Sequence, residues 1–265
     1  MNTSVHNGTA LVTGASSGIG AVYADRLARR GYDLILVARN AERLGTLATK
    51  LTDETGRSVE VMAADLTDRS DLSRVEKTLR TDASITLLLN NVGVGATAPL
   101  LQSEIGKMDA MIALNVSVPT HLSYAVAPAF VARGTGTIIN IASIVAIAPE
   151  LLNGVYGGSK AFVLAFSHSL HHELADRGIR IQVVLPGATA TEFWNFAGTP
   201  VANLPEGIVM SAEDMVDAAL TGLDQGELVT LPSLPELADW NAFEAARAAL
   251  GPNLSHALPA ARYAP

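Results

Sequence analysis

The stretch that decides the fold is Thr9-Ala10-Leu11-Val12-Thr13-Gly14-Ala15-Ser16-Ser17-Gly18-Ile19-Gly20, close to the start of a 265-residue chain. A short apolar run leads into a glycine turn, and a helical pattern follows through Arg30. This order of strand, glycine turn and helix is the context that a dinucleotide-binding loop requires. A plain turn is the alternative, but the position between a strand and a helix favours a phosphate loop.

The glycines of this loop have separate physical tasks. Gly14 permits the tight turn, Gly18 lets the backbone approach a pyrophosphate, and Gly20 lets the helix pack closely on the sheet. The start of the helix offers free N–H groups and the positive end of its dipole to phosphates. The spacing is G-x-x-x-G-x-G rather than G-x-G-x-x-G. We expect the cofactor to contact Gly14, Ser16, Ser17, Gly18, Ile19 and Gly20.

Apolar runs of strand length alternate along the chain with amphipathic segments of helix length. We predict strands at 9–13, 33–38, 58–64, 84–90, 135–142, 179–185 and 227–231. We predict helices at 18–30, 40–55, 68–81, 102–132, 154–177, 211–224 and 237–250. This alternation predicts an α/β fold, a single-domain Rossmann-like doubly wound parallel sheet of about seven strands flanked by helices.

The chain is expected to form one dinucleotide-binding domain over residues 1–265. The rhythm of strands and helices breaks at about 187–210, where Phe193, Trp194 and Phe196 lie close together. We interpret this segment as a substrate loop. A tail at about 233–265 follows the last predicted strand.

Composition excludes several classes of function. The formal net charge of −8 and the pI of about 5.2 argue against a nucleic-acid partner. The absence of cysteine excludes disulfides, thiol catalysis and cysteine-ligated zinc. The first nine residues are polar, and the longest apolar run, 138–149, is too short and too polar to cross a bilayer. We expect a soluble cytoplasmic protein without a membrane partner.

Tyr156 and Lys160 are four residues apart on a predicted helix and therefore lie on one face of it. A positive charge beside a phenol favours the phenolate and lowers the tyrosine pKa. The pair can then move a proton to or from a carbonyl or alcohol oxygen. The alternative is an amphipathic helix with a snorkelling lysine.

Several motifs in order resemble those of the short-chain dehydrogenase/reductase superfamily. They are T-G-x-x-x-G-x-G from Thr13, Asn90-Asn91-Val92-Gly93, Asn115, Ser143, Tyr156-x-x-x-Lys160 and Pro186-Gly187. The resemblance runs from Thr9 to Thr191 and continues more loosely to Pro232. The chain departs from the family at Val92, where alanine is usual.

The resemblance implies four catalytic residues. Tyr156 would donate the proton to a carbonyl, and Lys160 would lower the pKa of Tyr156 and hydrogen-bond the nicotinamide ribose. Ser143 would polarise the carbonyl oxygen, and Asn115 would hold a water that links Lys160 to solvent. All four positions are filled, which argues against a catalytically silent relative.

The turn after the second strand indicates which nicotinamide cofactor is bound. The strand ends in Val37-Ala38-Arg39-Asn40 without the carboxylate that binds a ribose 2′-hydroxyl. Arg39 has the planar donor fork that suits a 2′-phosphate, although it can also be a solvated loop residue. We therefore expect NADP(H) to be preferred, with NAD(H) possible. The second basic residue that many NADP-preferring relatives carry in the glycine loop is absent from Ala15-Ser16-Ser17.

Further cofactor contacts follow from the resemblance alone. Asp65 would contact the adenine amino group and Leu66 would pack beside the ring, while Asn90 would steady the central sheet. Thr191 is favoured over Thr189 for a phosphate contact. The other implied contacts are Asn91, Gly93, Tyr156, Lys160, Pro186 and Gly187.

The substrate site is expected to be apolar. By resemblance, Val94 and Val145 would line one wall, opposite Phe193 and Trp194 of the substrate loop. Such walls bury apolar groups and place no arginine or lysine against a charged substrate. No metal site is expected, because His168, His171 and His172 are more typical of a helix surface than of a metal centre.

These expectations give one leading function. The chain would be an NADP(H)-dependent oxidoreductase that reduces a hydrophobic ketone or aldehyde to an alcohol, or catalyses the reverse. A catalytically silent NADP(H)-binding sensor on the same fold is the alternative. Low charge (17% of residues) and two apolar helices, 102–132 and 154–177, predict a homo-oligomer, a dimer or a tetramer, and the resemblance favours the tetramer.

Overall fold

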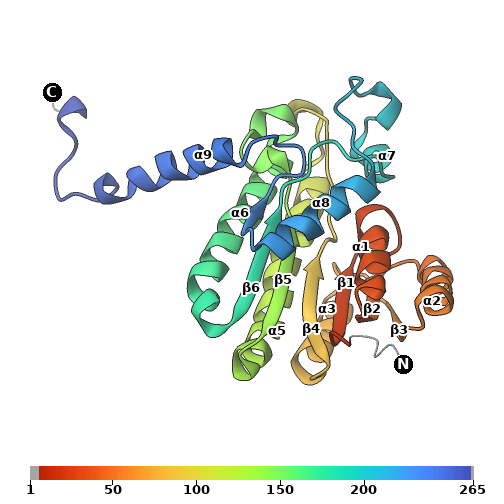
Figure 1. Ribbon diagram of the computed structural model, residues 1–265. Coiled ribbons are helices and arrows are strands. Elements are labelled where there is room, and N and C mark those ends of the chain that lie inside the picture. The colour runs from red at the N-terminus through yellow and green to blue at the C-terminus, as the bar shows by residue number, and fades with distance from the viewer. Residues whose placement is uncertain (1–5, 264–265) are drawn as a thin grey trace. The chain divides into compact units, whose positions relative to one another are not determined.

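The structure is a computed structural model that describes residues 6–263. It divides into two compact units, Met1–Pro232 and Ser233–Pro265. All seven strands belong to the first unit (Figure 1).

The first unit is built on one parallel sheet with the strand order β3-β2-β1-β4-β5-β6-β7. The order runs outward in two directions from β1 and β4. In a doubly wound sheet, ligands bind beyond the carboxyl ends of the strands at such a switch point. The strands are β1 (Thr9–Thr13), β2 (Asp33–Ala38), β3 (Val59–Ala63), β4 (Ile85–Asn90), β5 (Gly136–Ile141), β6 (Ile179–Val184) and β7 (Val229–Thr230).

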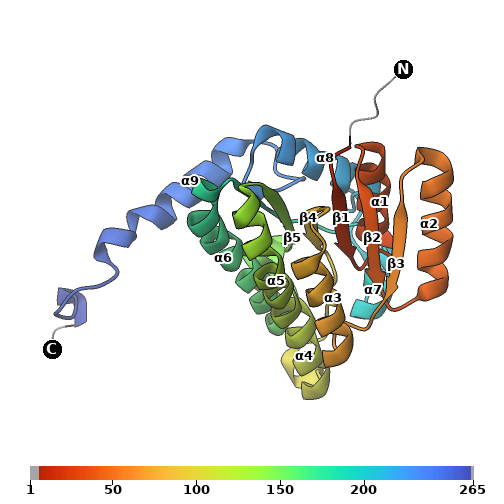
Figure 2. The ribbon, with the colours of Figure 1, turned by 90° about the horizontal axis from the view of Figure 1, so that it is seen from below.

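Helices cover both faces of this sheet (Figures 1 and 2). One core cluster joins the sheet to α1, α2 and α8, and the other joins it to α3, α5 and α6. Both faces of the central strands are therefore apolar, as predicted. The helices of the first unit are α1 (Gly18–Arg29), α2 (Ala41–Thr55), α3 (Arg69–Thr81), α4 (Ile105–Ile112), α5 (Val118–Arg133), α6 (Gly154–Leu174), α7 (Phe193–Ala197) and α8 (Ala212–Gln225).

The predicted helix at 102–132 is interrupted. A π-helical turn, Ala113–Ser117, joins α4 to α5 and contains Asn115. The continuous stretch Ile105–Arg133 is, by length and composition, the one part of residues 6–263 that could cross a membrane. Of its most apolar window, 44% is buried inside the fold.

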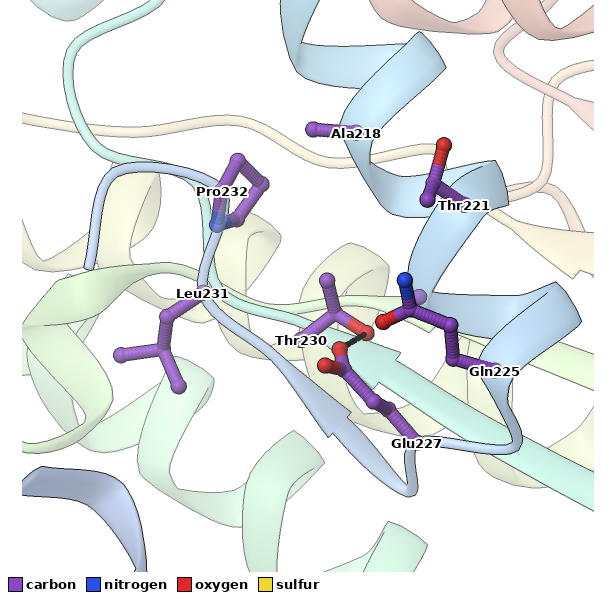
Figure 3. Close-up of a pocket in the computed structure, with 8 residues that line it drawn as sticks. Ala218, Thr221, Gln225, Glu227, Thr230, Leu231 and Pro232 are labelled. Carbon is purple, nitrogen blue, oxygen red and sulfur yellow. Dashed lines mark hydrogen bonds between the residues drawn. The ribbon is translucent and has the colours of Figure 1, made fainter. Parts of the chain in front are cut away.

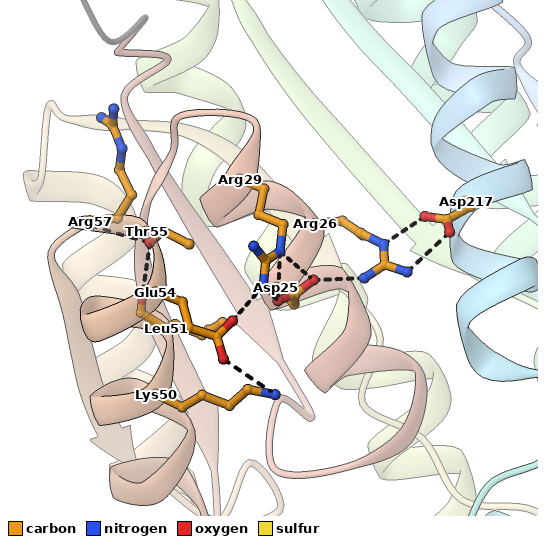
Figure 4. Close-up of polar contacts among 9 residues, drawn as sticks. All are labelled: Asp25, Arg26, Arg29, Lys50, Leu51, Glu54, Thr55, Arg57 and Asp217. Atoms are coloured by element: carbon orange, nitrogen blue, oxygen red, sulfur yellow. Dashed lines mark hydrogen bonds and ion pairs between the residues drawn. The ribbon is translucent and has the colours of Figure 1, made fainter.

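An ion-pair network fixes α1 between α2 and α8 (Figure 4). Arg26 donates to both carboxylate oxygens of Asp217 on α8 and to Asp25. Arg29 donates to Asp25 and to Glu54 on α2. Exposed pairs of this kind contribute about 0–1 kcal/mol each, so the apolar core rather than the network supplies most of the stability.

The second unit contains one α-helix, α9 (Leu237–Ala249), and two 3₁₀ turns among its described residues. The helix agrees with the one predicted at 237–250. Trp240 is buried, and its ring centroid lies 5.2 Å from that of Phe243.

Candidate active site

The glycine loop has the close backbone contacts that its sequence predicts. Gly14 has a φ of 66°, and a β-carbon on it would lie 2.8 Å from the Asn91 amide nitrogen. A β-carbon on Gly20 would lie 2.3 Å from the Gly14 carbonyl oxygen. A larger residue at Gly20 would push α1 away from the loop, and one at Gly14 would collide with Asn91 and Val92. The start of α1 is thereby held against the end of β1, where its N–H groups can meet phosphates.

Thr13 and Asn91 fasten the loop to the neighbouring strand. Thr13 Oγ1 donates to the Leu89 carbonyl and accepts from the Asn91 and Val92 amides, at 3.0, 3.0 and 3.2 Å. The Asn91 side-chain amide donates to the carbonyls of Thr13 and Gly14, at 2.9 and 3.2 Å. Asn91 therefore fixes the backbone of the glycine loop at Thr13 and Gly14. The resemblance implied a cofactor contact for Asn91 and did not specify this structural role.

Ser143, Tyr156 and Lys160 are brought together beside this loop. Ser143 follows β5 and donates to the Pro186 carbonyl at 3.4 Å. Tyr156 lies in the first turn of α6, and Lys160 lies one turn later. Ser143 acts on the Tyr156 phenol to lower its pKa, and the Lys160 ammonium lies 5.9 Å from the Tyr156 ring centroid. All three residues are at most 7% exposed, so water has little access to the group.

Burial controls the protonation of this group. It raises the pKa of Tyr156 to about 12, against a smaller lowering by the hydrogen bond with Ser143. It lowers the pKa of Lys160 to about 8. Lys160 is not among the causes of the net shift at Tyr156, and its predicted lowering of the Tyr156 pKa stays a prediction. The ammonium donates to the Ile141 carbonyl at 2.8 Å, and the desolvation of the phenol dominates.

Asn115 is almost fully buried at the π-helical turn. Its side chain accepts from the Val94 amide at 3.0 Å and donates to the Val94 carbonyl at 2.8 Å and to Ser159 Oγ at 3.0 Å. A β-carbon on Gly93 would lie 3.2 Å from Asn115 Oδ1 and 3.4 Å from Lys160 Nζ. Asn115 thus fixes the loop at residues 93–94 beside Lys160. Its predicted role in holding a water stays a prediction.

Asn153, which the sequence analysis missed, ties the same loop to the helix of Tyr156. It is the N-cap of α6 and accepts from the Val155 amide at 2.9 Å. Its amide nitrogen donates to the Ala98 carbonyl at 2.7 Å and to Ser103 Oγ at 3.1 Å. An asparagine just before a predicted helix is a recognisable cap, but its long-range partners have no signal in the sequence.

A second missed feature is a buried polar chain behind the site. The Asn90 amide donates to Asn140 Oδ1 at 2.9 Å and to Ser123 Oγ at 3.2 Å, and Asn140 donates to Ser167 Oγ at 2.9 Å. It joins β4 and β5 to α5 and α6. The prediction that Asn90 steadies the central sheet agrees with these contacts.

The apolar side of the site is formed around Tyr156. Val145 and Tyr156 belong to one buried cluster, against which Val94 and Phe193 pack. The ring centroids of Phe193 and Tyr156 are 5.8 Å apart. A β-carbon on Gly95 would lie 2.2 Å from the Phe193 ring, so glycine there makes room for it. Three of the four predicted substrate residues therefore lie beside Tyr156.

Trp194, the fourth predicted substrate residue, is buried and packs edge-on against Phe193. Its indole N–H donates to the Thr189 carbonyl at 2.9 Å, which anchors the start of the substrate loop. Its contact with substrate stays a prediction. Phe196, two residues further along the helix, is 81% exposed.

The predicted cofactor residues lie along the carboxyl edge of the sheet. A β-carbon on Gly18 would lie 3.1 Å from the Thr191 methyl carbon, so Thr191 lies over the glycine loop, whereas Thr189 is buried. Pro186 and Gly187 follow β6 and accept from Ser143 and Thr189.

The adenosine end is marked by Arg39, Asp65 and Leu66. Arg39 is exposed beyond β2, and within residues 6–263 its guanidinium has no hydrogen-bond partner. Asp65 Oδ1 accepts from the Thr67 amide and hydroxyl, and Leu66 is buried. These positions fit a dinucleotide across the switch point, because the exposed Arg39 guanidinium, whose charge adds to the Thr67 hydrogen bonds in lowering the pKa of Asp65, can also meet a phosphate at the end of β2.

A separate cavity of about 230 Å³ lies between α8 and β7 (Figure 3). It is lined by Gln225, Glu227 and Thr230, and Thr230 donates to Glu227 at 2.8 Å. None of the catalytic residues lines it. Within residues 6–263, no group of three His, Cys, Asp or Glu side chains is arranged to hold a metal ion.

Comparison with known proteins decides the family. The model of the short chain dehydrogenase family matches residues 8–200. The chain belongs to the short-chain dehydrogenase family. The fold resembles a short-chain dehydrogenase from Sphingobium yanoikuyae in complex with NADPH, with a TM-score of 0.94 and 49% identity over 97% of this chain and 100% of the other. The family prediction and the fold prediction are thus confirmed, and the cofactor is of the NAD(P) type.

Two further relatives bear on the substrate. The bulky-bulky ketone specific alcohol dehydrogenase from Comamonas testosteroni has a TM-score of 0.90 and 45% identity over 98% of this chain and 100% of its own. The very-long-chain 3-oxoacyl-CoA reductase of Anas platyrhynchos is 36% identical over 188 residues, which are 69% of this chain. Those residues span 60% of the reductase, less than two thirds of its length.

Proposed function

We propose that this short-chain dehydrogenase is an NADP(H)-dependent carbonyl reductase for neutral, bulky, hydrophobic ketones or aldehydes, and that Tyr156 is its general acid. The observation that carries the proposal is the buried Tyr156 phenol, with the Lys160 ammonium 5.9 Å and the Phe193 ring centroid 5.8 Å from its ring centroid. A catalytically silent NADP(H)-binding sensor requires only residues that contact the cofactor. It does not require a buried proton donor beside an apolar wall. The enzyme is therefore favoured over the silent alternative.

The protonation of the group suits the reductive direction. A bound nicotinamide supplies the hydride, and the substrate oxygen then needs a proton. With its pKa raised to about 12, Tyr156 holds that proton at neutral pH. The Ser143 hydroxyl can donate a second hydrogen bond to the developing oxyanion. The Lys160 ammonium stabilises negative charge on the phenol oxygen, and low exposure strengthens that attraction.

The preference for NADP(H) rests on two observations. The turn after β2 offers the unpaired Arg39 guanidinium and no carboxylate for a ribose 2′-hydroxyl. A relative with 49% identity binds NADPH. A cytoplasmic location, where NADPH is available, is consistent with this choice.

The substrate class rests on the walls of the site and on the relatives. Val94, Val145 and Phe193 surround Tyr156 with apolar surface. Burying each methylene of a substrate contributes about 0.8 kcal/mol, so larger apolar ketones gain affinity. The ketone specificity of the Comamonas relative points the same way.

The test is a substrate panel followed by NADPH absorbance. Purified protein is mixed with NADPH and with aryl–alkyl ketones, steroid ketones, 3-oxoacyl thioesters and small oxo acids. We expect the highest kcat/KM for bulky neutral ketones. Turnover that is highest with small anionic oxo acids would contradict the substrate class, and cofactor binding without turnover of any carbonyl would support the silent sensor.

A further inference from the structure

A bidentate ion pair links the substrate loop to α2. The Arg43 guanidinium donates through Nη1 to Glu192 Oε2 at 2.7 Å and through Nη2 to Glu192 Oε1 at 3.2 Å. The two residues are 149 positions apart in the sequence. The pair is not part of the catalytic group, and nothing in the proposed mechanism uses it.

Both partners lie at the mouth of the cofactor site. Arg43 is in the first turn of α2, four residues after Arg39, and it follows the turn where a ribose 2′-substituent is recognised. Glu192 is the residue before α7 and directly follows Thr191, which lies over Gly18. Hydrogen bonding to Arg43 holds the pKa of Glu192 below its ordinary value, with a smaller contribution from the Ser17 hydroxyl of the glycine loop. An anionic carboxylate is thus held between the glycine loop and the β2–α2 turn.

The same position suits a phosphate. A planar arginine fork binds carboxylate and phosphate oxygens with similar geometry, and phosphate carries the larger charge. The Arg43–Glu192 pair is about half exposed on both sides, and such pairs are weakly held in water. A 2′-phosphate that arrives at Arg39 can therefore displace Glu192 from Arg43.

We propose that Arg43 is a second binding residue for the ribose 2′-phosphate, and that Glu192 occupies it until the phosphate takes its place. This rests on the proposed preference for NADP(H). Arg43 then supplies the second basic group that the glycine loop lacks. When the phosphate replaces Glu192 at Arg43, the N-terminal end of the substrate loop is released from α2. NADH has no 2′-phosphate and leaves the Arg43–Glu192 ion pair intact.

Equilibrium binding tests the exchange without turnover. Dissociation constants are measured for NADPH, NADH and adenosine 2′,5′-bisphosphate with wild type, Arg43→Ala and Glu192→Gln. We expect Arg43→Ala to weaken NADPH and the bisphosphate about tenfold and to leave NADH unchanged. Glu192→Gln should tighten both phosphate ligands severalfold, because it removes the competing carboxylate, and it should have no such effect in the Arg43→Ala background.

A matched control is the Arg30–Asp224 pair, which is also bidentate and exposed but joins α1 to α8. Arg30→Ala should change none of the three dissociation constants. If Glu192→Gln changes the dissociation constants of NADPH and NADH equally, Glu192 does not compete with the 2′-phosphate. The ion pair would then only hold the substrate loop against α2. If Arg39→Ala removes the NADPH preference and Arg43→Ala does not, this inference alone fails. If wild type binds NADH as tightly as NADPH, the proposed cofactor preference fails as well.

Discussion

Burial moves the pKa values of Tyr156 and Lys160 toward their neutral forms, upward for the phenol and downward for the ammonium. The tyrosine is therefore a proton donor over the whole physiological range, and the lysine is the group that titrates near neutrality. Sequence spacing placed the two side chains on one helical face. It did not reveal the burial that sets their protonation.

The pH dependence of reduction should follow Lys160 rather than Tyr156. Lys160 is charged below a pKa of about 8 and loses its charge above it, so the stabilisation of the phenol oxygen is lost as pH rises. We expect kcat for ketone reduction to be level at neutral pH and to fall severalfold as pH increases through about 8. The NADPH dissociation constant is measured over the same range to separate binding from chemistry. A level kcat up to about pH 10, the ordinary pKa of lysine, would rule out this role for the ammonium.

Phe193 and Trp194 should select for substrate size. Phe193→Ala removes an aromatic ring packed beside Tyr156, and we expect it to raise KM for bulky ketones about tenfold while small ketones and NADPH are little affected. Trp194→Ala should act in the same direction. It should also lower stability by about 1 kcal/mol or more, because the hydrogen bond to the Thr189 carbonyl is lost. Equal effects on short and long substrates in steady-state kinetics would count against both residues as substrate contacts.

At the scale of elements, every predicted strand is present within two residues of its expected ends. Apolar runs and glycine turns specify such strands locally. The π-helical turn around Asn115 and the short helix α7 were not predicted, because both depend on distant partners. Asn115 is held by Val94 and Ser159. The helix α7 is held by Thr97, whose amide and hydroxyl both donate to the Ala197 carbonyl. The parts of the site that were missed are thus those made by long-range side-chain bonds.

The two glycines in α6 have different tasks. A β-carbon on Gly157 would lie 2.9 Å from Pro149 Cβ, whereas one on Gly158 meets nothing within 4 Å. Close packing against the 3₁₀ turn Pro149–Leu151 therefore explains the glycine at position 157.

Substitution by alanine should separate these tasks. Gly158→Ala should raise the free energy of unfolding by about 0.5–1 kcal/mol through helix propensity. Gly157→Ala should lower it by about 1–3 kcal/mol through overpacking. Denaturant unfolding of the two variants checks this. If Gly158→Ala loses as much stability as Gly157→Ala, the expected free space around Gly158 is contradicted. Another surface would then cover the side of α6 on which Gly158 lies.

At the scale of the whole molecule, we propose that the chain forms a homo-oligomer through α5 and α6. Tyr124 on α5 is 70% exposed and stacks on Phe166 of α6, which in turn stacks on Phe162. Exposed aromatic groups of this kind mark protein interfaces. We expect light scattering at micromolar concentration to give a dimer or a tetramer, and Tyr124→Glu to give a smaller species. A wild-type monomer would contradict the proposal.

The central claim is that this short-chain dehydrogenase reduces bulky ketones with NADPH and a proton from Tyr156. The most direct measurement is the rate of NADPH oxidation with a bulky aryl ketone, for wild type and for Tyr156→Phe, alongside the NADPH dissociation constant of each. Phenylalanine keeps the ring and removes the transferable proton. We predict turnover by wild type, and in Tyr156→Phe a loss of at least about a hundredfold in kcat with cofactor affinity unchanged. A variant that turns over at a rate comparable with wild type would contradict the account.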